Sequence, residues 1–204
     1  MKNKNRTLKL VQTAILVAIV LIMAFTPLGY LKVGIFSIAL VTIPVVIGAM
    51  TLGPGPGLIL GTVFGLTSFV QCFGMDAFGT TLFNINPILT FIMCVPTRML
   101  MGWLTGVIFR ALYRIDSTKI ICYFVGGLIG ALLNTLFFMT VFTLGFFHTP
   151  YVQGLAGGKS LTAFFIAMIG VNGIVEMLTC SIIGGGVSKA LSRLIKRTSD
   201  GEYI

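Results

Sequence analysis

Two charged residues lie deep inside apolar segments of this chain, Arg98 within Val95–Leu100 and Glu176 within Asn172–Leu178. The other charged residues lie at the termini or near breaks between apolar segments. A charge at the centre of a bilayer costs about 2.5–3.5 kcal/mol on insertion scales, so it is expected to be paired or to face a polar cavity. These two residues therefore mark helix faces that look inward, onto an ion pair or a binding site.

Other polar residues at similar depth extend this pair into a candidate site. Counted from the outer ends of their predicted helices, Arg98 and Asn134 lie about twelve residues deep and Glu176 about fifteen, all near mid-membrane at about 1.5 Å per residue. Asn172 lies one helical turn from Glu176 on the same face. The candidate substrate-binding residues are Asn84, Asn86, Arg98, Asn134, Asn172 and Glu176.

Two interpretations of these residues stay open at this point. Arg98 and Glu176 could form a structural ion pair, satisfied by Asn134, that only holds the helices together. Alternatively, a polar ligand binds above that pair, with Asn172 and the residues of the outer mouth making contacts. Asn86 also precedes a proline, and Asn-Pro is typical of a helix start, so this side chain is equally suited to cap a helix.

The sequence shows no catalytic or cofactor-binding pattern. His148 has no Ser or Asp partner nearby in sequence, and the four cysteines are scattered, so neither a nucleophile nor a metal site is expected. Gly158-Lys159-Ser160 resembles the end of a phosphate-binding loop, but Gln153 stands where that motif needs glycine. The chain is therefore predicted not to be an enzyme and to need no cofactor.

Composition places the chain in a membrane. Hydrophobic residues make up 56% of it, charged residues only 9%, and the mean hydropathy is +1.04, whereas soluble domains carry about 25% charged residues. The predicted class is an all-α integral membrane protein, with residues 1–204 forming a single six-helix domain. The first apolar segment is expected to be a retained helix and not a cleaved signal. The predicted spans cover residues 8–25, 35–52, 58–72, 87–112, 119–146 and 161–194.

The positive charges predict the topology. Eleven of the fourteen Lys and Arg residues fall on the side shared by both termini, which the positive-inside rule makes cytoplasmic. The loops 27–34, 73–83 and 148–160 are then outside. The net charge of +9 therefore reflects membrane orientation. Nucleic acid is not expected as a partner, since no aromatic residues are interleaved with the basic clusters.

Small residues recur at the spacing that lets helices approach closely. Gly57, Gly61 and Gly65 form two overlapping GxxxG steps, which we interpret as internal packing. Similar steps occur at 102–106 and 126–130. Ala14 and Ala18 form a small-xxx-small pair on the first helix, which could instead face another membrane protein.

Nearly the whole chain resembles the substrate-binding S components of energy-coupling factor (ECF) vitamin transporters. The resemblance rests on size, six spans, the basic N-terminus, the Ala14-xxx-Ala18 pair and the segment Ile43–Pro54. It implies a multi-pass protein of the bacterial cell membrane, surrounded by lipid, that docks through Ala14 and Ala18 onto a transmembrane coupling protein carrying two cytoplasmic ATPases. The S component then topples in the membrane and releases its vitamin inside.

Within that family the chain is most similar to pantothenate-specific members, through Asn86-Pro87, Val95–Arg98 and Gly170–Glu176. Pantothenate carries a carboxylate, hydroxyls and an amide, for which an arginine and asparagines are suitable partners. An S component for another micronutrient such as riboflavin is the first alternative. A stand-alone carrier driven by protonation of Glu176 and a membrane-embedded enzyme are the others.

Overall fold

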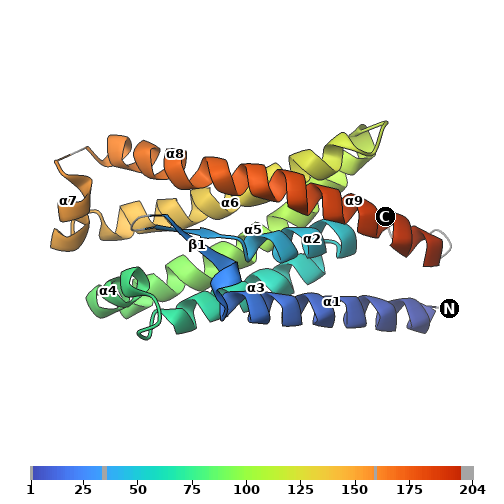
Figure 1. Cartoon of the computed structure of the whole chain (residues 1–204), viewed down its shortest axis with the longest axis horizontal. Coiled ribbons are helices and arrows are strands. Elements are labelled where there is room, and N and C mark those ends of the chain that lie inside the picture. The colour runs from blue at the N-terminus through green and yellow to red at the C-terminus, as the bar shows by residue number, and fades with distance from the viewer. Residues whose placement is uncertain (1, 34–35, 159, 199–204) are drawn as a thin grey trace.

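The computed structural model describes residues 2–33, 36–158 and 160–198, which form a bundle of helices crossed by one short β-hairpin (Figure 1). The N-terminal end of α1 and the C-terminal end of α9 lie at one end of the bundle, and the short helices α4 and α7 lie at the other. The elements are α1 (Lys2–Ala24), η1 (Pro27–Gly29), β1 (Tyr30–Val33), β2 (Phe36–Ala39), α2 (Thr42–Leu52), α3 (Pro54–Gln71), α4 (Ala77–Ile85), α5 (Pro87–Ile115), α6 (Ile121–Phe146), α7 (Pro150–Ala156), α8 (Leu161–Thr179), the π-helical turn η2 (Cys180–Gly184) and α9 (Gly185–Thr198).

Four helical segments of the described chain are long and apolar enough to cross a membrane: 6–24, 87–115, 121–146 and 173–192. The mainly helical class is thus confirmed, with four candidate membrane spans in the described part of the chain in place of the six predicted. Helix α2 has only 11 residues, about 17 Å at 1.5 Å per residue, which is well short of a ~30 Å hydrocarbon core. The third predicted span begins earlier than expected, because only Gly53 breaks the chain, with φ 96°, and α3 starts at Pro54.

A β-hairpin replaces the first part of the predicted second span, so the all-α assignment was wrong there. Tyr30 pairs with Ala39 and Val33 with Phe36 in an antiparallel register. The Val41 backbone N–H donates to the Gly29 carbonyl at 3.2 Å and closes the hairpin at its base. The residues are rich in β-branched and aromatic types, which favour strands. An apolar segment of this length cannot be assigned to helix or strand by periodicity alone.

Two predicted outer loops contain short helices. Asp76 caps the start of helix α4, where its carboxylate accepts a hydrogen bond from the Gly79 N–H at 2.8 Å. Thr149 caps the start of helix α7, where its hydroxyl accepts from the Val152 N–H at 3.4 Å. Both side chains satisfy backbone donors that a helix start leaves free. Lys159, in the second of these loops, lies outside the described residues.

The glycine steps pack helices against one another, as predicted. A Cβ built on Gly61 of α3 would collide with the backbone carbonyl oxygen of Arg98 on α5, and one built on Gly57 would collide with the carbonyl of Gly102. A Cβ on Gly65 would approach Val95 Cα to 2.7 Å. Bare glycine surfaces thus let α3 and α5 touch through their backbones. This contact fixes the depth and direction of the Arg98 backbone.

We expect Gly61→Ala to destabilise the protein, because the added methyl group must push Arg98 and α5 away. Overpacking of this kind costs about 1–3 kcal/mol, equivalent to a fall of roughly 2–12 °C in unfolding midpoint for a chain of this size. The measurement is thermal unfolding in detergent, followed by tryptophan fluorescence.

Gly55→Ala provides the matched control for this prediction. It lies in the same helix, and a Cβ there meets nothing within 4 Å. Its midpoint should stay the same or rise slightly, since alanine restricts the unfolded chain. Equal midpoints for the two variants would show that the α3–α5 contact is looser than described.

Candidate functional site

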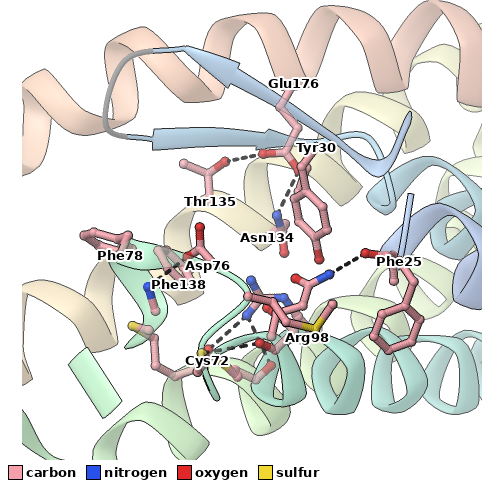
Figure 2. A pocket seen from close by; sticks show the side chains of 18 of the residues that line it. Phe25, Tyr30, Cys72, Asp76, Phe78, Arg98, Asn134, Thr135, Phe138 and Glu176 are labelled. Carbon is pink, nitrogen blue, oxygen red and sulfur yellow. Dashed lines mark hydrogen bonds between the residues drawn. The ribbon is translucent and has the colours of Figure 1, made fainter. Parts of the chain in front are cut away.

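A cavity of about 340 Å³ lies beneath the hairpin, among α3, α5, α6 and α8 (Figure 2). Its volume falls in the range of small-molecule sites, roughly 300–1,000 Å³. The segment that follows α1 and the start of α4 also line it. Its polar lining residues include Tyr30, Gln71, Asp76, Arg98, Asn134 and Glu176.

Arg98 is the cationic group of this cavity and is only 6% exposed. Its Nη1 donates to the carbonyl oxygens of Met93 and Cys94, each at 3.2 Å, on its own helix. The guanidinium carbon lies 4.7 Å from the centre of the Phe64 ring and 5.1 Å from that of Phe138. Aromatic faces stabilise a cation that has left water. Neutral groups therefore hold Arg98 in place, and its positive charge remains available to an anionic ligand.

Glu176 reaches the same cavity from α8 and is 5% exposed. Three side chains donate to its carboxylate: Thr42 to Oε1 at 2.7 Å, Asn134 to Oε1 at 2.8 Å, and Thr135 to Oε2 at 3.2 Å. Within the described part of the chain no ion pair joins it to Arg98, so the structural pair considered from the sequence is not formed. Glu176 is satisfied by neutral donors, and among the described residues no carboxylate lies within salt-bridge distance of Arg98.

Unpaired polar atoms gather in this cavity. Among the described residues four buried side-chain atoms lack a hydrogen-bond partner, and three of them belong to cavity residues: Tyr30 Oη, Arg98 Nε and Asn134 Oδ1. The Ser68 side chain lies within hydrogen-bonding reach of the Tyr30 hydroxyl, but the two groups do not meet with the geometry of a full hydrogen bond. Buried polar groups in native proteins almost always have a partner, whether protein, ordered water or ligand. These three atoms meet at one cavity, where they are available to a polar ligand.

Residues 8–184 match the family model for the ECF transporter substrate-specific component. The chain belongs to this family. It is thus an S component, the membrane-embedded subunit that binds a vitamin or another micronutrient for a transporter and works with an ECF module. The family is one of transporter subunits, not of enzymes. A comparison with individual curated proteins gives no match.

In this S component the structure brings together three of the six predicted binding residues. Arg98, Asn134 and Glu176 line the cavity. Asn84 and Asn86 are exposed and do not line it. Asn86 caps α5 instead, where its Oδ1 accepts from the Leu89 N–H at 3.1 Å, which is the structural role considered for it above. The side chain of Asn172 lies outside the described residues.

Tyr30 is the main cavity residue of this S component that the sequence analysis missed. It enters the cavity because the hairpin folds over the site, and the segment was not predicted to be a hairpin. A signal was present: Tyr30–Val33 and Phe36–Ala39 are two short runs rich in strand-forming residues around a glycine, a pattern typical of hairpins. Phe138 was also missed, since phenylalanine is too frequent here to single one out.

The alanine pair lies on the surface of the S component. Ala14 and Ala18 are exposed, while Leu16 and Val20 on another face of α1 are buried against the bundle. The helix leaves much of its apolar surface uncovered, with Ile15 55% exposed. The pair is thus accessible to lipid or to another membrane protein.

Proposed function

We propose that this S component binds pantothenate, or a vitamin with a similar carboxylate, in the cavity beneath the hairpin. The observation that carries the proposal is the state of Arg98: buried, positioned by neutral groups, and without a carboxylate partner in the described part of the chain. A guanidinium forms its strongest hydrogen bonds with carboxylates. The anionic end of the ligand therefore binds at Arg98.

The other unpaired atoms fit the remainder of such a ligand. Asn134 Oδ1 is an acceptor and needs a hydroxyl or amide N–H, and the Tyr30 hydroxyl can donate or accept. Pantothenate offers hydroxyls and an amide in addition to its carboxylate. Glu176 is already satisfied by three donors. We therefore assign it no direct contact with the anionic end of the ligand.

The transport cycle of this proposal follows the family. Helix α2 with the hairpin and helix α3 complete six membrane-crossing segments together with α1, α5, α6 and the α8–α9 helix. Both termini are cytoplasmic, which is consistent with the start of α1 and the end of α9 lying at one end of the bundle (Figure 1). The cavity opens outward in the bacterial cell membrane. Ala14 and Ala18 dock on the coupling protein, whose two ATPases drive toppling and release.

Aromatic cavity walls favour a second candidate ligand. Phe25, Phe78 and Phe138 line the cavity with Tyr30, and stacking on such rings would suit a flavin. Riboflavin is therefore the alternative ligand for the same site. A yellow colour of the purified protein, with flavin absorbance, would favour it.

Binding titrations and reconstituted uptake test the proposal. Purified S component should bind D-pantothenate tightly and riboflavin weakly or not at all. In proteoliposomes, uptake of labelled pantothenate should require the coupling protein, the ATPases and ATP. If the protein binds riboflavin and not pantothenate, the proposed ligand is wrong but the proposed site stands. Uptake by the S component alone would contradict the ECF mechanism and favour a stand-alone carrier.

A further inference from the structure

We infer that Glu176 is a positioning residue that orients the Asn134 side chain, so that the amide oxygen and not the amide nitrogen faces the ligand. An asparagine amide has one accepting end and one donating end of nearly equal size. Which end faces a cavity decides whether the ligand must donate or accept. In this cavity the Glu176 carboxylate determines which end of the Asn134 amide faces the ligand.

The contacts around Glu176 support this orientation. Asn134 Nδ2 donates to Glu176 Oε1 at 2.8 Å, and Thr42 donates to the same oxygen at 2.7 Å. An ionised carboxylate only accepts hydrogen bonds. Rotating the Asn134 amide by half a turn would place its oxygen against this carboxylate and break the bond. The orientation drawn in Figure 2, with the amide nitrogen on Glu176, is therefore the stable one.

The oxygen end of the Asn134 amide is then left for the ligand. Asn134 is 6% exposed, lines the cavity, and its Oδ1 has no partner among the described residues. A ligand that places a hydroxyl or amide N–H at this oxygen satisfies it, and one that places an acceptor there is rejected. The inference rests on the proposed function. It requires that the ligand carry two groups: an anionic group that meets Arg98 and a hydrogen-bond donor that meets Asn134.

A stability measurement tests the inference without any ligand. Asn134→Asp puts a second carboxylate against Glu176 and removes the donor between them, so the unfolding midpoint should fall by roughly 5 °C or more. Asn134→Asp combined with Glu176→Gln restores a donor, now on residue 176, and should recover most of the loss. The inference is overturned if Asn134→Asp unfolds at the same temperature as the wild type. It is also overturned if the double variant has no higher unfolding midpoint than Asn134→Asp alone.

Binding measurements then test the effect on the ligand, with D-pantothenate and two analogues as probes. One analogue lacks both hydroxyls and the other carries an N-methylated amide. In the wild type, loss of the donor that meets Asn134 should weaken binding about 5- to 150-fold. Glu176→Leu frees the amide to rotate, so this discrimination should shrink to less than about threefold. Glu176→Gln can present either its amide oxygen or its amide nitrogen to Asn134, so it should reduce the discrimination less than Glu176→Leu does.

The outcomes separate this inference from the proposed ligand. A purely structural role for Glu176 would make Glu176→Leu lose affinity equally for all three probes, which would overturn the inference. Wild-type protein that binds none of the probes would contradict pantothenate as ligand. In that case the Asn134→Asp and double-variant midpoints alone decide the role of Glu176.

Discussion

Arg98→Ala is expected to weaken pantothenate binding roughly 30-fold to a few thousand-fold. Truncating one partner of a buried, hydrogen-bonded charge pair costs about 2–5 kcal/mol, and each 1.4 kcal/mol is tenfold in affinity. The penalty is large because the ligand carboxylate would remain buried with no cation in reach. Isothermal titration calorimetry on the purified variants measures it.

Two controls make the Arg98 result specific. Arg114→Ala removes an exposed arginine from the last turn of the same helix and should leave affinity within about twofold, because its charge is solvated. The unfolding midpoint of Arg98→Ala shows whether the fold is intact. Unchanged affinity together with a lowered midpoint would mean that Arg98 serves only the packing of α3, α5 and α6.

Replacing Ala14 and Ala18 together by phenylalanine is expected to abolish transport while binding stays within about threefold of wild type. Two large side chains on an exposed face of α1 prevent the close helix approach that small residues allow. Neither residue lines the cavity, so ligand affinity should be unaffected. Uptake in proteoliposomes and co-purification with the coupling protein measure the loss.

The matched control replaces both alanines by serine. Serine is also small, so docking and uptake should persist. If the phenylalanine variant still forms the complex and transports pantothenate, then docking does not use this face of α1. Loss of binding in both variants would point instead to a general defect in folding.

The polar residues at the centre of the site could be predicted from the sequence, but the β-hairpin that covers the cavity could not. Arg98, Asn134 and Glu176 could be found because a polar residue at membrane depth is costly wherever it lies, and helix geometry alone places them at one level. The hydrogen-bond partners of these three residues could not be predicted from depth in the membrane. Thr42 donates to Glu176 from a helix far away in sequence, and threonines are too common in apolar helices to be singled out.

The hairpin shows a different limit. A segment such as 35–41 is apolar enough to belong to a buried helix or to a buried strand, and its length does not decide between them. The strand forms because residues 30–33 supply an antiparallel partner, which is a property of two segments together. Tyr30 and the upper wall of the cavity depend on that pairing. In contrast, the Asn86–Pro87 helix start was recognisable because capping is local.

Mass spectrometry of the small molecule released from purified wild-type protein tests the central claim most directly. We expect the cavity beneath the hairpin to hold a vitamin whose carboxylate meets Arg98 and whose donor meets Asn134 Oδ1, and we propose that this vitamin is pantothenate. Arg98→Ala protein, purified in parallel, should release much less of it. A wild-type protein that releases a ligand with no anionic group, in amounts that Arg98→Ala does not change, would contradict the account.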